Sequence, residues 1–92
     1  MEWKLFADLA EVAGDRHVEV DLGDGATVED AFEALLADRP ALRDRVLDEN
    51  GDLREHINVL CNGHNVFSEE EGWETTLSAG DELALFPPVS GG

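Results

Sequence analysis

The last two residues, Gly91 and Gly92, are the residues whose type and position best suit covalent chemistry. Glycine loses more conformational freedom on ordering than any other residue, so a folded domain gains little from a terminal pair. At a glycine frequency of about 7%, such a pair ends roughly 0.5% of chains by chance. A thread without Cβ atoms can instead enter a narrow tunnel and present the carboxylate of Gly92 to an enzyme. A frayed end is the simpler alternative.

Other side chains that could carry chemistry are few. Cys61 is the single cysteine, which excludes an intramolecular disulfide and a cysteine-based metal framework. It lies in an apolar run, where a buried and inert thiol is expected. His17, His56 and His64 lack the spacing of metal ligands and are interpreted as surface or turn residues. We therefore expect no catalytic residue, no metal, no bound cofactor and no enzymatic activity of the chain itself.

Length and composition favour one small folded domain. The chain has 92 residues, of which 42% are hydrophobic, and this is enough for a single core. No apolar run is long enough to cross a bilayer, and the start of the chain lacks the pattern of a secretory signal. These features predict a cytoplasmic protein without a membrane partner.

The charge balance is strongly acidic, with 22 acidic residues against six basic ones and a net charge of −16. Phosphates need basic partners, so direct binding of nucleic acid is not expected. An acidic surface suits a cytoplasm of very high salt, where screening suppresses self-repulsion. Alternatively, the acids form one face for a basic partner. Their dispersal along the chain favours the adaptation to salt.

The first half of the sequence predicts two strands followed by the main helix. Residues 3–6 and 17–22 are expected to be strands, the second because apolar and polar residues alternate there. Residues 7–14 form either one or two helical turns or a loop. Thr27 can cap a helix whose apolar stripe runs to Leu36. Pro40 then starts a shorter helix.

The second half predicts three further strands, over residues 56–61, 64–67 and 82–86. Asn62-Gly63 between the first two is a strong hairpin signal, because both residues accept positive φ. The acidic segment 68–74 is expected to be exposed, except for Trp73, which folds back onto the body. The fold class is therefore α+β, with a mixed sheet of about five strands packed on one main helix plus a short helix.

The last strand and the residues after it predict a projecting arm. Leu83 and Leu85 share one face of the strand, and Ala84 and Phe86 share the other. If the leucines face the helix, Phe86 is displayed on the open face of the sheet. Two prolines follow and favour polyproline II geometry, which would let residues 87–92 reach roughly 19 Å from the sheet. We expect a folded domain over residues 1–86 and a flexible Gly-Gly tail over residues 87–92.

These features resemble the small archaeal modifier proteins, which are ubiquitin-like proteins of haloarchaea related to the small subunit of molybdopterin synthase. The resemblance rests on the ending Phe86-Pro87-Pro88-Val89-Ser90-Gly91-Gly92, on residues 3–14 and on the turn at residues 79–82. It covers essentially the whole chain and implies a β-grasp fold. Residues 67–74 are longer and more acidic than the family pattern.

The resemblance also implies a mechanism, in which an ATP-dependent enzyme of the ubiquitin-activating type adenylates Gly92. Attack by sulfur would then give a thiocarboxylate for molybdopterin synthesis, with the large subunit of molybdopterin synthase as partner, or for tRNA thiolation. Attack by a lysine of a target protein would give an isopeptide bond. Gly91 would provide access to the enzyme, which consumes the ATP.

The resemblance further implies an apolar docking face on the sheet, for which Phe6, Phe86 and Val59 are the candidates. Core packing is the alternative role for Phe6. Lys4, the single lysine, could itself accept a modifier, although an exposed lysine usually has no role beyond its contact with solvent.

A different function class is a noncovalent ubiquitin-like binding module. Such a module would keep its partner after loss of Gly91-Gly92 and lose it on Phe86→Ala. A β-grasp ferredoxin needs several cysteines and is excluded.

Overall fold

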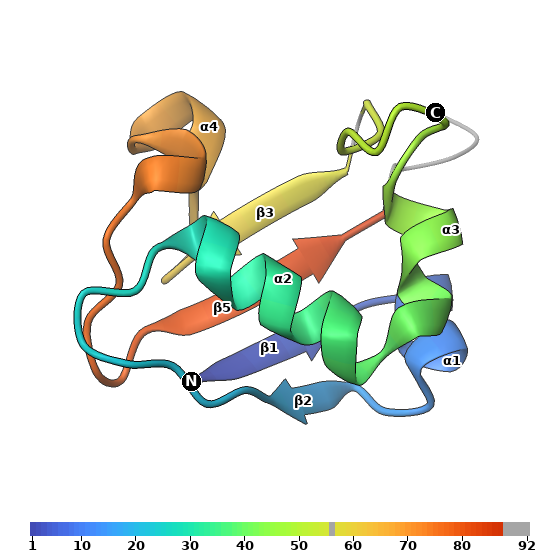
Figure 1. Cartoon of the computed structure of the whole chain (residues 1–92), viewed down its shortest axis with the longest axis horizontal. Coiled ribbons are helices and arrows are strands. Elements are labelled where there is room, and N and C mark those ends of the chain that lie inside the picture. The colour runs from blue at the N-terminus through green and yellow to red at the C-terminus, as the bar shows by residue number, and fades with distance from the viewer. Residues whose placement is uncertain (56, 88–92) are drawn as a thin grey trace.

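The computed structural model describes residues 1–55 and 57–87, in which short helices alternate with strands (Figure 1). The strands are β1 (Glu2–Leu5), β2 (His17–Glu19), β3 (Asn58–Cys61), β4 (His64–Asn65) and β5 (Glu82–Phe86). The α-helices are α1 (Asp8–Ala13), α2 (Val28–Asp38), α3 (Arg43–Val46) and α4 (Val66–Glu69). Two 3-10 turns are η1 (Pro40–Leu42) and η2 (Gly72–Glu74).

The strands form one mixed sheet in the order β2-β1-β5-β3-β4. β1 and β5 come from opposite ends of the chain and pair in parallel, whereas the other neighbours are antiparallel. Helix α2 crosses one face of this sheet, and α3 lies beside it on the same side (Figure 1). The predicted α+β class, with five strands on one main helix and a short helix, is confirmed.

Helix α2 begins and ends where its sequence predicts. The Thr27 hydroxyl accepts a hydrogen bond from the Asp30 amide at 3.3 Å, and the Asp30 carboxylate accepts one from the Thr27 amide at 3.0 Å. This capping box satisfies amides that the first helical turn leaves unpaired. Pro40 disfavours a helical conformation of Arg39, which adopts φ −129° and ends the helix.

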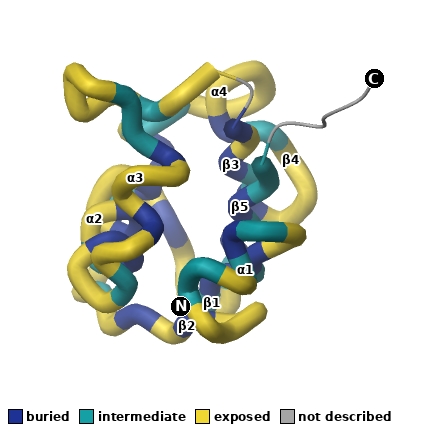
Figure 2. The backbone as a smooth tube through the Cα atoms, turned by 90° about the vertical axis from the view of Figure 1, so that its right-hand side faces the viewer, coloured by how far each residue is buried: buried dark blue, intermediate teal, exposed yellow. Residues whose placement is uncertain are grey.

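The core lies between α2 and the sheet, and Trp3 fills its centre with none of its surface exposed. The Trp3 indole nitrogen donates a 3.0 Å hydrogen bond to the Ala31 carbonyl oxygen of α2, so burial leaves no polar group unpaired there. Seen from the side in Figure 2, α2 and α3 lie on one side of β3 and β5. Leu83 and Leu85 of β5 are fully buried toward the helices, as the alternation predicts.

The predicted strand over residues 64–67 is wrong in its second half. Only His64 and Asn65 pair with β3, and the chain then turns into α4. The Asn65 side-chain oxygen accepts a 2.9 Å hydrogen bond from the Phe67 amide. The Glu69 carboxylate accepts one from the Asn65 amide at 3.0 Å. These local bonds cap a helical turn and outcompete continued strand pairing.

Other segments refine the predicted elements. Residues 7–14 adopt the helical alternative, as α1, and Gly14 ends it with φ 86°. Only His17–Glu19 of the predicted strand 17–22 pairs regularly, although the Val20 amide still donates to the Met1 carbonyl oxygen at 2.8 Å. At the predicted hairpin, Asn62 and Gly63 have φ 52° and 84°. Trp73 folds back as predicted, with its ring 5.0 Å from that of Phe32.

The predicted boundary between domain and tail stays a prediction, because residues 88–92 lie outside the described residues. Strand β5 ends at Phe86, where the predicted domain also ends. In the part of the chain described here, no helix is long and apolar enough to cross a membrane.

Candidate functional site

The candidate site is the face of the sheet that α2 does not cover, which we call the open face. It carries Lys4, Phe6, Leu60, Ala84 and Phe86, whose neighbours along each strand point into the core. The pairing register brings them together, because Lys4 lies opposite Ala84 and Ala84 opposite Leu60. Three strands from distant parts of the sequence therefore contribute to one surface.

Two aromatic rings stack at the end of the open face where β5 continues into Pro87. The rings of Phe6 and Phe86 lie 4.1 Å apart, with 9° between their planes. Phe6 remains 38% exposed, so its alternative role in core packing is wrong. Phe86 is half-buried and lies on the open face, as predicted. The pair forms an apolar surface, which we call the aromatic plate, beside the last described residue, Pro87.

The turn after β1 positions Phe6 over Phe86. Ala7 adopts φ 54°, a region that residues with a Cβ rarely occupy, and the Ala10 amide bonds its carbonyl oxygen at 3.1 Å. A hollow of about 430 Å³ opens beside the ring of Phe6 and reaches Arg16 and His17. The plate and the hollow together give a partner an apolar surface with a place to insert a side chain.

Val59 does not belong to the open face, and its prediction as a docking residue is wrong. It is fully buried and pairs with Leu85, which also faces the core. Leu60, the next residue in β3, is half-buried on the open face. The apolar run of β3 contains both residues, and only its register against β5 decides which one faces out.

The opposite end of the open face is acidic. Glu2 of β1 lies between Glu19 of β2 and Glu82 of β5 in the pairing register. Like charges in directly opposed positions repel one another. Lys4 offsets part of this repulsion, because it pairs with Glu82 at 2.9 Å, and His17 lies 3.4 Å from Glu2. The open face therefore runs from an aromatic end to an acidic end.

The ion pair with Glu82 favours the protonated form of Lys4. The hydrogen bond from Lys4 to Glu82, together with the charge of that carboxylate, raises the pKa of Lys4 above its ordinary value. Only a neutral amine attacks an acyl group, so a raised pKa reduces the reactivity of Lys4 near neutral pH. The role of Lys4 as an acceptor stays a prediction, and the ion pair opposes it.

We expect Glu82→Gln to speed acylation of Lys4 by an amine-reactive ester about two- to fivefold at pH 9, the effect of losing one exposed ion pair. Peptide mapping by mass spectrometry measures the rate at Lys4, with the α-amino group as internal reference. Glu2→Gln is the matched control, because Glu2 raises the pKa of Lys4 least among the named causes. Equal rates in both variants would show that Glu82 does not restrain the amine.

The remaining chemistry-bearing residues of the described chain lie apart from the open face. Cys61 is buried, and desolvation with the nearby charge of Asp81 raises the pKa of its thiol. A thiol held protonated is a poor nucleophile, as the sequence predicts. His64 lies 3.5 Å from Glu69 on the surface. Within residues 1–55 and 57–87, no three His, Cys, Asp or Glu side chains are placed to hold a metal ion.

The two residues with the predicted covalent role, Gly91 and Gly92, lie outside the described residues, as does His56. The structure therefore places the docking candidates but not the reacting end. Sequence reasoning placed Ala84 on the same face as Phe86 but missed Leu60, which forms one row with Ala84 and Lys4 across β3, β5 and β1. The apolar run that contains Leu60 was visible in the sequence, but the face that Leu60 occupies was not.

Comparison with known proteins connects this chain to a family. The ThiS family model matches residues 3–92. The chain is 59% identical to small archaeal modifier protein 1 of Haloferax volcanii, over the full length of both. It is 36% identical to a molybdopterin synthase sulfur carrier subunit of Chlamydomonas reinhardtii, over 95% of this chain and 92% of that one.

A solved structure agrees with the sequence comparison. The crystal structure of SAMP1 from Haloferax volcanii superposes with a TM-score of 0.90 at 58% identity, and covers 100% of this chain and 98% of that one. Together with the match to the family model, this agreement assigns both family and fold: the chain belongs to the ThiS family and has the β-grasp fold.

Proposed function

We propose that this protein is a ubiquitin-like modifier and sulfur carrier that is activated at Gly92. The observation that carries the proposal is that the family match extends to residue 92 and so includes the Gly-Gly end. The relatives named as a modifier and as a sulfur carrier subunit both align over nearly the whole chain. Both uses need the same activated C-terminal carboxylate.

The chemistry starts from a poor electrophile. An ATP-dependent enzyme of the ubiquitin-activating type joins the Gly92 carboxylate to the α-phosphate of ATP, and pyrophosphate leaves. The resulting mixed anhydride has a carbonyl carbon open to attack. A sulfur nucleophile displaces AMP and leaves a thiocarboxylate, which supplies sulfur for molybdopterin synthesis or tRNA thiolation. A target lysine displaces AMP and leaves an isopeptide bond.

Each part of the chain has a separate task in this scheme. Gly92 reacts, and Gly91 keeps the thread narrow enough to enter the active site of the enzyme. The stacked pair Phe6 and Phe86 offers the docking surface beside the tail. The chain is thus the carried group, and its partners are the activating enzyme, the large subunit of molybdopterin synthase and lysine-bearing targets.

Intact-mass spectrometry tests the proposal directly. The protein is incubated with ATP, its activating enzyme and a sulfur source, and then with a lysine-bearing target. We expect an adenylate, a thiocarboxylate and a lysine adduct, each mapped to Gly92 by fragmentation. If none of the three forms, the proposal is wrong.

The stacked aromatic pair also favours a second candidate, a noncovalent binding module that uses the open face alone. In that case the partner binds whether or not Gly91 and Gly92 are present. Retained binding of the deletion variant, without any covalent product from the full chain, would select this candidate.

We expect Phe86→Ala to raise the KM for this chain in the adenylation reaction about tenfold or more, with less change in kcat. Truncating an aromatic residue at the centre of an interface typically costs this much. Phe67→Ala is the matched control, because Phe67 is a 43% exposed phenylalanine on α4, away from the open face. An equal rise in KM in the two variants would show that Phe86 has no specific role in docking.

A further inference from the structure

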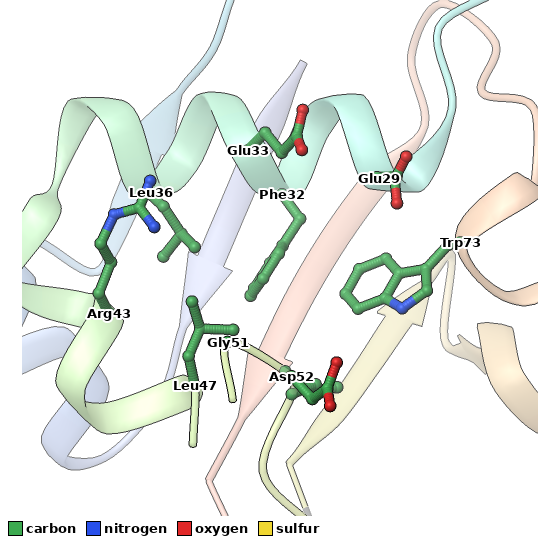
Figure 3. A pocket seen from close by; sticks show the side chains of 10 residues that line it. Glu29, Phe32, Glu33, Leu36, Arg43, Leu47, Gly51, Asp52 and Trp73 are labelled. Atoms are coloured by element: carbon green, nitrogen blue, oxygen red, sulfur yellow. The ribbon is translucent and has the colours of Figure 1, made fainter. Parts of the chain in front are cut away.

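A second surface lies on the helical side of the molecule, away from the open face. It is a cleft of about 610 Å³ between α2, the turn at residues 51–53 and Trp73 (Figure 3). Phe32 and Leu36 of α2 form part of its apolar wall, and Leu47 faces them. The sheet separates this cleft from the plate of Phe6 and Phe86, so the two surfaces can be occupied together.

The acidic segment 68–74, to which the proposed function assigns no task, supplies one wall of the cleft. Trp73 is half-buried, and its ring lies 5.0 Å from those of Phe32 and Phe67. Gly72 has φ 63°, and a Cβ there would lie 3.3 Å from the Phe67 ring. The backbone is thus shaped to hold the indole against α2.

Three carboxylates line the cleft that contains this indole. Glu29 and Glu33 are one helical turn apart on α2, and Asp52 projects from the opposite side, so that Trp73 lies between Glu29 and Asp52 in Figure 3. In the described chain, none of the three carboxylates has an ion pair or a side-chain hydrogen bond. Glu29 lies in the first turn of α2, where the helix dipole favours a negative charge, but Glu33 has no such role and repels Glu29 from position i+4.

Among the described residues that line the cleft, the single cation lies at its other end. Arg43 extends beside Leu36 and Leu47, away from Trp73 (Figure 3). Its charge opposes a cationic ligand at that end and leaves the aromatic end as the negative part of the cleft. The cleft therefore has an apolar wall, an indole face and a carboxylate rim, with a defined polarity.

We propose that this cleft binds an arginine side chain of a partner protein, with the guanidinium beside Trp73 and the aliphatic stem along Phe32 and Leu36. A planar guanidinium stacks on indole and pairs with carboxylates in a fixed geometry, which a compact ammonium does less well. The cleft is a recognition site for a basic partner on the face opposite to the aromatic plate. This inference is independent of any chemistry at Gly92.

The test uses the full-length protein, labelled with ¹⁵N, and the peptide acetyl-Gly-Arg-Gly-amide. The probe for comparison is the same peptide with citrulline, which has the shape of arginine without its charge. Titration at a salt concentration that preserves the fold should shift the indole N–H of Trp73 saturably. The buried indole of Trp3 serves as internal reference. We expect the citrulline peptide to bind about tenfold more weakly.

Paired variants separate the cleft from the overall charge. Glu29→Gln with Asp52→Asn should weaken binding of the arginine peptide about fivefold or more. Glu11→Gln with Glu19→Gln removes the same amount of charge from exposed positions outside the cleft. This double variant should change the affinity for the arginine peptide by less than about twofold. Amide spectra confirm that each variant is folded.

Three results would overturn the inference. Equal binding of the citrulline peptide would reduce the site to an apolar groove. Equal weakening in the two double variants would mean attraction to the net charge alone. Shifts confined to the open face, with Trp73 unchanged, would place the basic ligand elsewhere.

Discussion

Deletion of Gly91 and Gly92 is expected to reduce formation of the adenylate, the thiocarboxylate and the lysine adduct at least about a hundredfold, with the melting temperature unchanged. The deletion leaves a carboxylate on Ser90, and the thread becomes roughly 6 Å shorter at about 3.1 Å per residue. Reacting atoms must approach to about 3–3.5 Å, and a misplacement of about 1 Å already costs on the order of a hundredfold. The last buried core residue of the described chain is Leu85 of β5, so we expect the fold to remain intact after the deletion.

Single-turnover adenylation, followed by intact mass, measures this effect. Gly91→Ala in the full-length chain separates the effect of the width of the tail from that of its length, because it adds a Cβ atom without shortening the tail. We expect this variant to lose adenylation rate to an intermediate extent. Sulfur that still enters the truncated chain would contradict the assignment of Gly92. Cys61 would then be the residue to map, although its thiol is buried and its pKa is raised.

Transfer from molar to about 10 mM salt is expected to lower the melting temperature by roughly 10–20 °C or more, which corresponds to a few kcal/mol for a domain of this size. The chain carries a net charge of −16, and its ion pairs occupy only a minority of the 22 acidic residues in the described part. The Debye length is about 3 Å at 1 M salt and about 30 Å at 0.01 M. The molecule measures 37 × 27 × 25 Å, so at low salt each carboxylate acts on most of the others.

Thermal denaturation followed by circular dichroism checks this expectation over a salt series. Glu70→Gln with Glu71→Gln removes two exposed carboxylates and should reduce the loss at low salt while changing little at molar salt. A melting temperature that is independent of salt would show that the acidic surface does not govern stability. Rescue by sucrose to the same extent as by salt would point to solvent exclusion instead of screening.

Several parts of the fold follow from local chemistry. Thr27 and Asp30 lie three residues apart and form the capping box of α2, whose buried stripe repeats at the helical period. Asn62 and Gly63 accept positive φ and close the hairpin. Gly14 ends α1 for the same reason. Neighbouring residues suffice for each of these features, so the sequence alone predicts them.

The candidate site depended on longer-range contacts. Val59 and Leu60 are adjacent apolar residues of one strand, and either could face a partner until β3 pairs with β5. Phenylalanine is a residue type common in protein cores, but the turn at Ala7 places the ring of Phe6 on that of Phe86, which comes from the other end of the chain. The cleft beside Trp73 similarly needs α2, residues 51–53 and η2 to meet.

The sequence by itself determined the fold class, the capped helix, the inert cysteine and the Gly-Gly end on which the proposed chemistry rests. Tertiary structure decided that Leu60 and not Val59 is on the open face, that Phe6 and Phe86 form one plate, and that Trp73 walls a separate cleft. The physical reason is the separation along the sequence between the residues that interact. Periodicity and capping act over a few residues, whereas strand register and ring stacking are set by partners many residues apart, and a shift of one residue exchanges the two faces of a strand.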